Sequence, residues 1–419
     1  MHIVFFNRSF YPDVSATGQL LTDLCEDLVR DHGCRVSVIT GPPLRPAVPV
    51  PTGRGLVTRD AYRGIAILRA NGTTFDKRRF AGRAANYVSY FLSASWAGLR
   101  VEKPDVVVSL TDPPIIGIAA WMAGRKAGAP LVMVFQDLFP EVTALLPDFH
   151  SDTINGALQR VSRFLCRRAR RIVALGQTMR QRLIDNKGAD PAKIDIIENW
   201  ADTTTLIPGQ KPNRFSEANG LSDRFVVMHS GNLGLSQNLE TIVDAAALLT
   251  DLRDLTVVFQ GEGVKKADLQ RRAHELNLSN VQFLPYADRE ALTESFATAD
   301  VFVISLQQGL AGYIVPSKLY GILAAGRPYV AAVEPDCEVT ALTKRHACGV
   351  IAEPGNAADL AARIRELYAD RSTACTMGTR AREAALGFDR RKQVLKYLEV
   401  FQAAREVPSG SRAVREART

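Results

Sequence analysis

The chain has 419 residues, 46% of them hydrophobic and 23% charged, and a formal net charge of +8. This composition is typical of a soluble globular protein, and the length suits two domains. No apolar run reaches the roughly 18 residues of a membrane-spanning helix, and the start "MHIVFFNRSFYP" predicts a strand and not a signal peptide. We therefore expect a cytoplasmic protein whose positive charge attracts an anionic partner.

The cysteines and histidines show no metal-binding spacing. The six cysteines include no CxxC pair, which predicts reduced thiols, and the six histidines form no i,i+4 pair. The chain also has no D-x-D pair to hold a divalent metal. We therefore expect neither a metal nor another cofactor.

Short apolar, β-branched runs alternate with helical stretches, which predicts βα units around parallel sheets. In the first half the predicted strands are 2–7, 35–40, 65–70, 105–110, 130–137, 171–176 and 193–199. A polar segment with proline and glycine, 201–223, has the composition of a linker. After it the pattern restarts with predicted strands at 224–231, 255–263, 281–287, 301–306, 328–334 and 349–354.

The fold class predicted from this pattern is α/β, with two doubly wound, Rossmann-like domains and a cleft between them. We place the N-terminal domain at 1–203 and the C-terminal domain at 204–387. A last helix, 388–406, is expected to pack back toward the first domain, and 407–419 is a polar tail. Ligands of such sheets bind beyond the carboxyl ends of the strands, so the loops after the strands are the places to search.

The stretch "HSGNLGLSQNLETIVDAA" (229–246) joins a predicted strand to a predicted helix through a glycine turn. Gly231 and Gly234 let the backbone approach a ligand, and a helix that begins near Gln237 or Asn238 offers N–H groups to a phosphate. The spacing is neither G-x-G-x-x-G nor that of a P-loop. A turn that uses glycine for its geometry alone is the alternative.

The stretch "YIVPSKLYGILAAGRP" (313–328) predicts a buried helix that begins with a serine and a lysine. Ser317 suits the N-cap and Lys318 the first turn, where a cation opposes the helix dipole. A bound anion would remove this conflict, so both residues are candidates to hold a diphosphate. A plain cap followed by a solvated lysine is the alternative.

The stretch "AAVEPDCEVTALTKRHACGV" contains two glutamates at the end of the next predicted strand, Glu334 and Glu338. Either carboxylate could accept hydrogen bonds from a ribose or a sugar. Glu338 could equally be a favourable charge in the first turn of the following helix.

The first predicted strand is followed by a long loop and a helix that starts near Thr17 or Gly18. A residue as small as Gly18 would let a substrate lie against the start of the helix. An ordinary loop with a glycine near the N-cap is the alternative.

In "VFQDLFPEVTALLP" (134–147), Asp137 and Glu141 follow a predicted buried strand. If 138–146 is helical, both carboxylates face the same way and are candidates for catalysis, because a carboxylate there can orient sugar hydroxyls or act as a base. A helix cap and a solvated glutamate are the alternative.

Together these loops resemble the retaining GT-B glycosyltransferases of family 4, in the bacterial branch that builds polysaccharide, O-antigen and colanic acid repeat units. The stretches that carry the resemblance are "YPDVSATGQLLTDLCEDLV", "QDLFPE", "IIENWAD", "SGNLGLSQNLETIVDAA", "GEGVKKADLQ" and "VPSKLYGILAAGRP". The resemblance implies a nucleotide-sugar donor on the C-terminal domain, with a UDP-sugar favoured. It implies an acceptor on the N-terminal domain, retention of anomeric configuration and no metal.

The chain departs from the commoner pattern of this family at four positions. Two glutamates of many relatives are replaced by Tyr313 and Gly321, and an Arg and a Lys by Asn232 and Gln237. The resemblance then makes Lys318 the principal counter-charge of the diphosphate. The full set predicted to bind the donor is Gly18, Gly231, Asn232, Gly234, Lys265, Ser317, Lys318 and Glu338.

Other functions remain alternatives at this point. A nucleotide-sugar epimerase shares the GT-B shape, although the scattered histidines do not favour it. A nicotinamide-dependent oxidoreductase would need G-x-G-x-x-G in the first βα unit, which is absent. A non-enzymatic anion-binding protein would explain the charge, but a nucleic-acid binder usually interleaves aromatic residues, and these make up only 7% of the chain.

Two basic amphipathic stretches, 76–104 and 158–171, predict docking on an anionic bilayer. A helix that packs on its own sheet is the alternative. Acceptors in the resembling branch are often polyprenyl-diphosphate-linked sugars. We therefore expect a peripheral association with the inner face of the plasma membrane. The residues behind this expectation are Lys77, Arg78, Arg79, Phe80, Arg83, Ala84, Tyr87, Val88, Phe91, Leu92, Leu99, Arg100 and Lys103.

Overall fold

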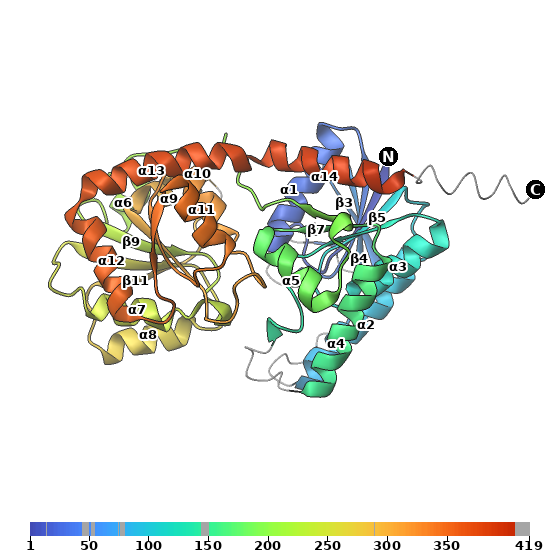
Figure 1. Cartoon of the computed structure of the whole chain (residues 1–419), viewed down its shortest axis with the longest axis horizontal. Helices are drawn as coiled ribbons and strands as arrows, with labels where there is room; N and C mark the ends of the chain where they lie inside the picture. The colour runs from blue at the N-terminus through green and yellow to red at the C-terminus, as the bar shows by residue number, and fades with distance from the viewer. Residues whose placement is uncertain are drawn as a thin grey trace, which may run out of the picture. The chain divides into compact units, whose positions relative to one another are not determined.

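The computed structural model describes residues 1–13, 15–43, 50–51, 55–73, 75, 80–143, 151–288 and 290–406. The chain forms two compact units, the first made of residues 1–198 together with the segment from 391 onward, and the second of residues 199–390. Each unit is a sheet of mostly parallel strands flanked by helices (Figure 1). The prediction of two doubly wound α/β domains is confirmed.

The first unit is built on an eight-stranded sheet of order β3-β4-β2-β1-β5-β6-β7-β8, parallel except for the β3–β4 pair. The apolar runs predicted as strands form this sheet because their side chains are buried on both faces. The strands are β1 (His2–Phe6), β2 (Arg35–Thr40), β3 (Val57–Tyr62), β4 (Ile65–Ala70), β5 (Val106–Ser109), β6 (Leu131–Val134), β7 (Arg171–Ala174) and β8 (Ile194–Ile196).

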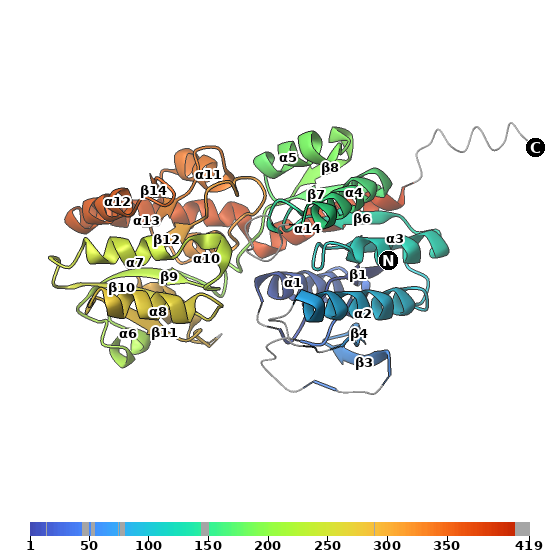
Figure 2. The ribbon, with the colours of Figure 1, turned by 90° about the horizontal axis from the view of Figure 1, so that it is seen from below.

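Helices connect these strands, and in the first unit α3 lies between α2 and α4 (Figure 2). The chain returns to this unit at its end, where Phe401 of the last helix packs edge-on against Phe5 of β1. The helices are α1 (Ala16–Arg30), α2 (Phe80–Gly98), α3 (Ile116–Ala127), α4 (Asp152–Arg168), α5 (Gln177–Lys187), the 3-10 turn η2 (Pro191–Lys193) and α14 (Arg390–Arg405).

The second unit is built on a six-stranded parallel sheet of order β11-β10-β9-β12-β13-β14. Its strands are β9 (Phe225–Ser230), β10 (Leu255–Gln260), β11 (Val281–Leu284), β12 (Val301–Ser305), β13 (Tyr329–Ala332) and β14 (Gly349–Ala352). Its helices are α6 (Arg214–Ala218), η3 (Leu235–Gln237), α7 (Glu240–Ala247), α8 (Lys266–Glu275), α9 (Leu292–Thr298), α10 (Lys318–Ala324), α11 (Glu338–His346), α12 (Ala357–Ala369), α13 (Arg371–Ala385) and η4 (Leu386–Phe388).

Two apolar clusters cover the two faces of the second sheet. Alternate residues of β9 divide between them: Met228 joins the cluster with α9, α10 and α11, whereas Val227 joins the cluster with α7, α8 and α12. Burial on both faces explains why β9 is a continuous apolar run in the sequence. Both faces of this sheet are therefore taken up by the apolar core.

Three local features differ from the sequence-based expectations. Strand β3 was not predicted; it is a half-exposed edge strand paired antiparallel with β4, and its polar sequence lacks an apolar run. The segment 201–223 contains the short helix α6, which is fixed by a capping box between Asn213 and Ser216. Helix α7 begins at Glu240 because Asn238 adopts a left-handed conformation with φ of 44°.

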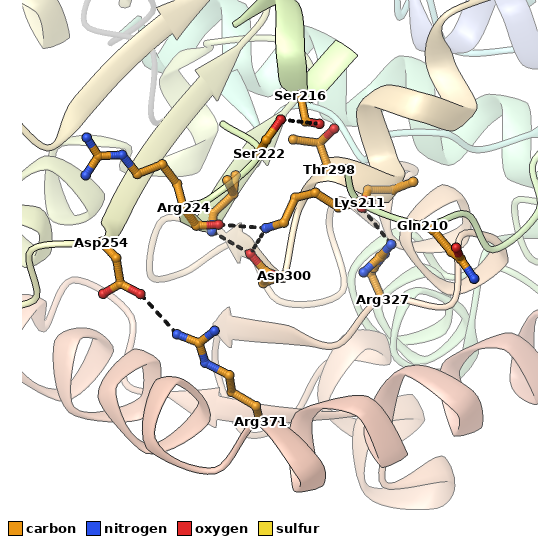
Figure 3. A network of polar contacts seen from close by, with 12 residues as sticks. Gln210, Lys211, Ser216, Ser222, Arg224, Asp254, Thr298, Asp300, Arg327 and Arg371 are labelled. Carbon is orange, nitrogen blue, oxygen red and sulfur yellow. Dashed lines mark hydrogen bonds and ion pairs between the residues drawn. The ribbon is translucent and has the colours of Figure 1, made fainter. Parts of the chain in front are cut away.

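A network of polar contacts lies where the strands of the second sheet begin (Figure 3). Lys211 donates to the Arg224 carbonyl at 2.7 Å and pairs with Asp300, which also accepts from the Val226 backbone N–H at 2.7 Å. Arg327 donates to two backbone carbonyls at 2.7 and 2.6 Å. These contacts tie the entering segment to the sheet, so the polar groups at this edge serve the fold.

No helix within the described ranges combines the length and the apolar character needed to cross a bilayer.

Candidate functional site

The loops after β9 and β10 touch through their backbones at the carboxyl edge of the second sheet. A Cβ on Gly261 would lie 1.9 Å from the carbonyl oxygen of Gly231, and one on Gly263 would lie 2.1 Å from that of Leu233. Gly261 also has a φ of +144°, which side chains disfavour. The glycines of "GEG" therefore make room for the glycine turn that was predicted to bind phosphate.

Hydrogen bonds fix this contact between the two loops. The backbone N–H of Gly231 donates to the Gln260 carbonyl at 2.9 Å, and that of Leu233 donates to the Glu262 carbonyl at 2.9 Å. The backbone N–H of Lys265 donates to the Leu233 carbonyl at 3.1 Å. Backbone hydrogen bonds thus hold the turn against the loop that follows β10.

Lys318 brings a cation to this turn from α10. Its Nζ lies 3.5 Å from the position that a Cβ on Gly231 would occupy, and 2.9 Å from Nε2 of His229. No carboxylate pairs with Lys318 within the described part of the chain. The ammonium is therefore uncompensated beside the glycine turn, as a site for an anion requires.

Burial shapes the titration of both partners. Removal from water lowers the pKa of Lys318 to about 7. Burial and, second, the Lys318 cation hold the pKa of His229 well below its usual range. Desolvation favours the neutral form of each base, whereas an anion at the site would favour the charged lysine.

Ser317 is the N-cap of α10, as its sequence position predicted, but its side chain makes no capping hydrogen bond. Glu334 anchors the loop that leads into this helix. Its Oε2 accepts from the backbone N–H groups of Gly309 and Ala311, at 3.0 Å each. Of the two glutamates left open by the sequence, Glu334 therefore uses its carboxylate to shape the loop, whereas Glu338 begins α11.

Lys265, the second cation predicted for the donor, forms an ion pair with Glu240 at the start of α7, with Nζ and Oε1 2.6 Å apart. An ion pair of this kind neutralises most of the field of the lysine. The geometry therefore favours Lys318 over Lys265 as the cation for a diphosphate.

In the first unit, Asp137 lies beyond the carboxyl end of β6, and Asp112 beyond that of β5. Burial, and second the charge of Asp112, raise the pKa of Asp137 to about 7. Burial also raises the pKa of Asp112, against the opposing effect of Arg8 and a hydrogen bond from Ser9 at 3.1 Å. Asp112 was not singled out in the sequence, although it follows a predicted strand, 105–110, in "SLTDPP".

Glu141 has a different environment from Asp137. Both of its carboxylate oxygens accept from the buried ammonium of Lys187, at 2.9 and 2.7 Å. The described residues after Asp137, up to Thr143, form turns and not the predicted helix, and 144–146 lie outside the described residues. The sequence could not reveal Lys187, because it is 46 positions away.

Gly18 lies in the first turn of α1, where its N–H donates to the Ser15 side chain at 3.3 Å. A Cβ there would lie 2.9 Å from Ser15 Oγ and 3.4 Å from the backbone of Ser9. Its small size therefore serves this packing, and its predicted contact with the donor stays a prediction.

Two family models match the chain, one after the other. Residues 16–200 match the "Glycosyl transferase 4-like domain" and residues 211–384 match "Glycosyl transferases group 1". The chain belongs to the GT-B glycosyltransferases described by this pair of domains, and it is a transferase enzyme. The family match therefore removes the oxidoreductase, epimerase and non-enzymatic alternatives.

Curated relatives agree with the family. The chain is 26% identical over 298 residues to the probable glycosyltransferase WbjE of Pseudomonas aeruginosa, covering 70% of this chain and 73% of the relative. It is 24% identical over 378 residues to the putative colanic acid biosynthesis glycosyl transferase WcaI of Escherichia coli K12, covering 87% and 92%.

Solved structures share the fold at low sequence identity. Anabaena HepE, in a complex with UDP and glucose, has a TM-score of 0.73 at 19% identity, covering 96% of this chain and all of that one. WaaG, a glycosyltransferase involved in lipopolysaccharide biosynthesis, has a TM-score of 0.70 at 16% identity, covering 95% and 99%. These likenesses support the GT-B fold.

Proposed function

We propose that the protein moves a sugar from a nucleoside-diphosphate donor, with a UDP-sugar favoured, to a saccharide acceptor of cell-surface polysaccharide synthesis. The observation that carries this proposal is the uncompensated Lys318 ammonium beside Gly231. A diphosphate carries the opposite charge and forms short, charge-assisted hydrogen bonds. Asn232, in the turn beside this ammonium, is exposed.

Lys318 takes the place of charges that the chain lacks elsewhere in the turn. Positions 232 and 237 carry Asn and Gln, where the resemblance to family 4 implies cations. The cation instead approaches from α10 on the neighbouring loop. The proposal assigns the counter-charge of the diphosphate to Lys318.

The preference for uridine and the retention of configuration rest on similarity. HepE, which shares the fold, was solved with UDP and with UDP-glucose. Retention is implied by the resemblance to family 4 and needs a product analysis of its own.

For the acceptor side, the proposal favours Asp137 over Glu141. A carboxylate with a pKa near 7 can accept a proton from a sugar hydroxyl close to neutral pH. Glu141 already uses both of its oxygens on Lys187. Asp137 is therefore the carboxylate proposed to contact the reacting hydroxyl, with Glu141 holding the loop that carries it.

We also propose that the acceptor is lipid-linked and that the first unit docks on an anionic bilayer. On α2, Val88, Leu92 and Trp96 recur every four residues and are 51%, 61% and 39% exposed. Arg100 extends this line and covers the Trp96 ring, with its guanidinium 4.0 Å from the ring centroid. Lys77, Arg78 and Arg79 lie outside the described residues, as does the side chain of Arg83.

A basic row on α4 complements this apolar line. Arg160, Arg163 and Arg167 are exposed at spacings of three and four residues, so they share one side of the helix. Helix α3 lies between α2 and α4 (Figure 2). It adds Trp121, whose ring is contacted by the Arg125 guanidinium. Exposed apolar and aromatic side chains next to arginines suit the headgroup region of an anionic membrane.

The test of the donor site is Lys318→Ala, assayed by UDP affinity and by turnover of UDP-sugars. Loss of a charge-assisted contact should cost about 1.5–3 kcal/mol of binding, whereas fold stability should change little. Lys266→Ala is the control, because Lys266 follows the same loop but pairs with Glu262 at 2.6 Å. UDP affinity at the wild-type level in Lys318→Ala would show that the diphosphate lies elsewhere.

A further inference from the structure

We infer that His229 is a positioning residue of the donor site, whose neutral imidazole holds the Lys318 ammonium in place beside Gly231. The inference rests on the proposed function, in which Lys318 binds the donor diphosphate. It adds a residue that was not among the sequence predictions.

His229 lies in the strand that leads into the glycine turn, and it is out of contact with solvent. It is the fifth residue of β9 and has 0% exposure, and its ring lies 6.2 Å from the Phe259 ring on the neighbouring strand β10. Lys318, 89 positions later, reaches Nε2 at 2.9 Å. The two side chains therefore meet from the end of β9 and the start of α10, with the histidine as the buried partner.

The chemistry of the pair fixes its protonation pattern. When Lys318 is charged, its ammonium has only donors, so Nε2 accepts and the imidazole is neutral, with its proton on Nδ1. A charged imidazole would have no acceptor and would repel the ammonium. The groups that face the ring from the surrounding elements are Gln237 and the backbone at Asn232 and Val303, and they add no charge.

This contact has a consequence for binding. A free lysine side chain gives up rotamer freedom when it is fixed on a ligand, and this lowers affinity. Lys318 already contacts His229 before the donor arrives. His229 therefore acts through Lys318 and need not touch the donor.

A buried histidine that serves only the core is the competing explanation. It would support the fold with or without Lys318, so the two explanations differ in a double-mutant cycle. We would measure UDP affinity by calorimetry and donor KM and kcat for wild type, His229→Leu, Lys318→Ala and the double variant. His229→Gln keeps a side-chain acceptor, and His229→Phe is a second acceptor-free variant if His229→Leu does not fold.

The expected result is that His229→Leu weakens UDP binding and raises donor KM about tenfold, with a smaller change in kcat. His229→Gln should recover most of this loss. In the Lys318→Ala background, His229→Leu should have no further effect on UDP affinity. As a control, His2→Leu removes a buried histidine of the first unit, which lies 3.0 Å from Ser37, and should leave UDP affinity unchanged.

The opposite outcomes overturn the inference. Equal losses from His229→Leu with and without Lys318 would show a structural role, and so would a failure of His229→Gln to recover affinity while its melting temperature stays normal. If Lys318→Ala weakens UDP binding but His229→Leu and His229→Phe do not, only this inference fails. If Lys318→Ala has no effect on UDP binding, the proposed diphosphate contact is wrong, and the inference about His229 falls with it.

Discussion

The ammonium of Lys187 donates to both carboxylate oxygens of Glu141, at 2.9 and 2.7 Å, and to the Phe139 carbonyl at 2.7 Å. The lysine side chain is fully buried at the end of α5, and that of Glu141 is 23% exposed. One cation thus joins the loop after β6, which carries Asp137, to a helix of the same unit.

Glu141→Gln should therefore act on the fold more than on the reaction. It leaves a buried ammonium without its counter-charge, and breaking a buried pair in this way typically costs about 3–5 kcal/mol. Lys187→Met, which removes the cation and keeps an apolar stem, should cost less. Thermal and denaturant unfolding would measure both. A stable Glu141→Gln protein with no acceptor turnover would instead place Glu141 in the chemistry.

Asp137→Asn should abolish the rise of kcat with pH. If Asp137 accepts the proton of the acceptor hydroxyl, kcat of the wild type rises with pH through about 7. The kcat of the variant should be about 100-fold lower and should no longer rise with pH through this range. A variant with wild-type kcat and acceptor KM would remove Asp137 from the chemistry.

The stability of Asp137→Asn gives an independent control on that interpretation. The pKa of Asp137 is raised from 3.8 to about 7, so the folded state holds this proton more tightly than the unfolded state. Wild-type stability therefore falls as pH rises through this window. The gain in melting temperature from Asp137→Asn should be larger at pH 8 than at pH 4.

UDP binding should take up a proton above neutral pH. The pKa of Lys318 in the free enzyme is lowered to about 7 by burial, and a bound diphosphate raises it again. At pH 8 the free lysine is mostly neutral and must gain a proton, whereas at pH 6 it is already charged. Calorimetry in buffers of different ionisation enthalpy would measure this uptake, and Lys318→Ala should show none. Proton release at pH 8 would contradict the assignment.

Sedimentation with vesicles would test the docking surface. Recovery should be high on anionic vesicles at low salt, low on neutral ones, and should fall as salt screens the attraction. Arg160→Glu with Arg167→Glu should reduce it about tenfold or more, since each basic side chain near the surface contributes about 1 kcal/mol. The matched control is Lys344→Glu with Arg345→Glu on α11 of the second unit. Equal recovery on both vesicle types would exclude electrostatic docking.

The fold could be predicted from the sequence because its central strands are buried on both faces. Runs such as "RFVVMHSG" and "VFVISL" carry that signal in every residue. Strand β3 escaped prediction because only one of its faces approaches the core, and its residues are polar. The helix after the glycine turn was predicted to begin too early. The reason is the left-handed conformation of Asn238, which depends on its neighbours.

The candidate site was less accessible to sequence reasoning. Lys318 could be found because a cation in the first turn of a buried helix conflicts with the helix dipole. His229 looked like an ordinary strand residue, and its contact with Lys318 spans 89 positions. Lys265 looked available until the structure showed Glu240 at 2.6 Å. Local patterns report on helix ends and turns, whereas the pairing of charges depends on tertiary contacts.

Gly261 and Gly263 closely approach the turn at 231–233. This backbone contact means that the shape of the turn and the charge of its side chains can vary independently. Backbone atoms alone define the turn, so its side chains are not needed to maintain it. Substitutions at 232 and 237 can therefore change the local charge while the turn keeps its form. The counter-charge proposed for the donor, Lys318, accordingly comes from another element, α10. Variation among such loops should thus be wide in side-chain charge and narrow in the glycines of the adjacent strand end.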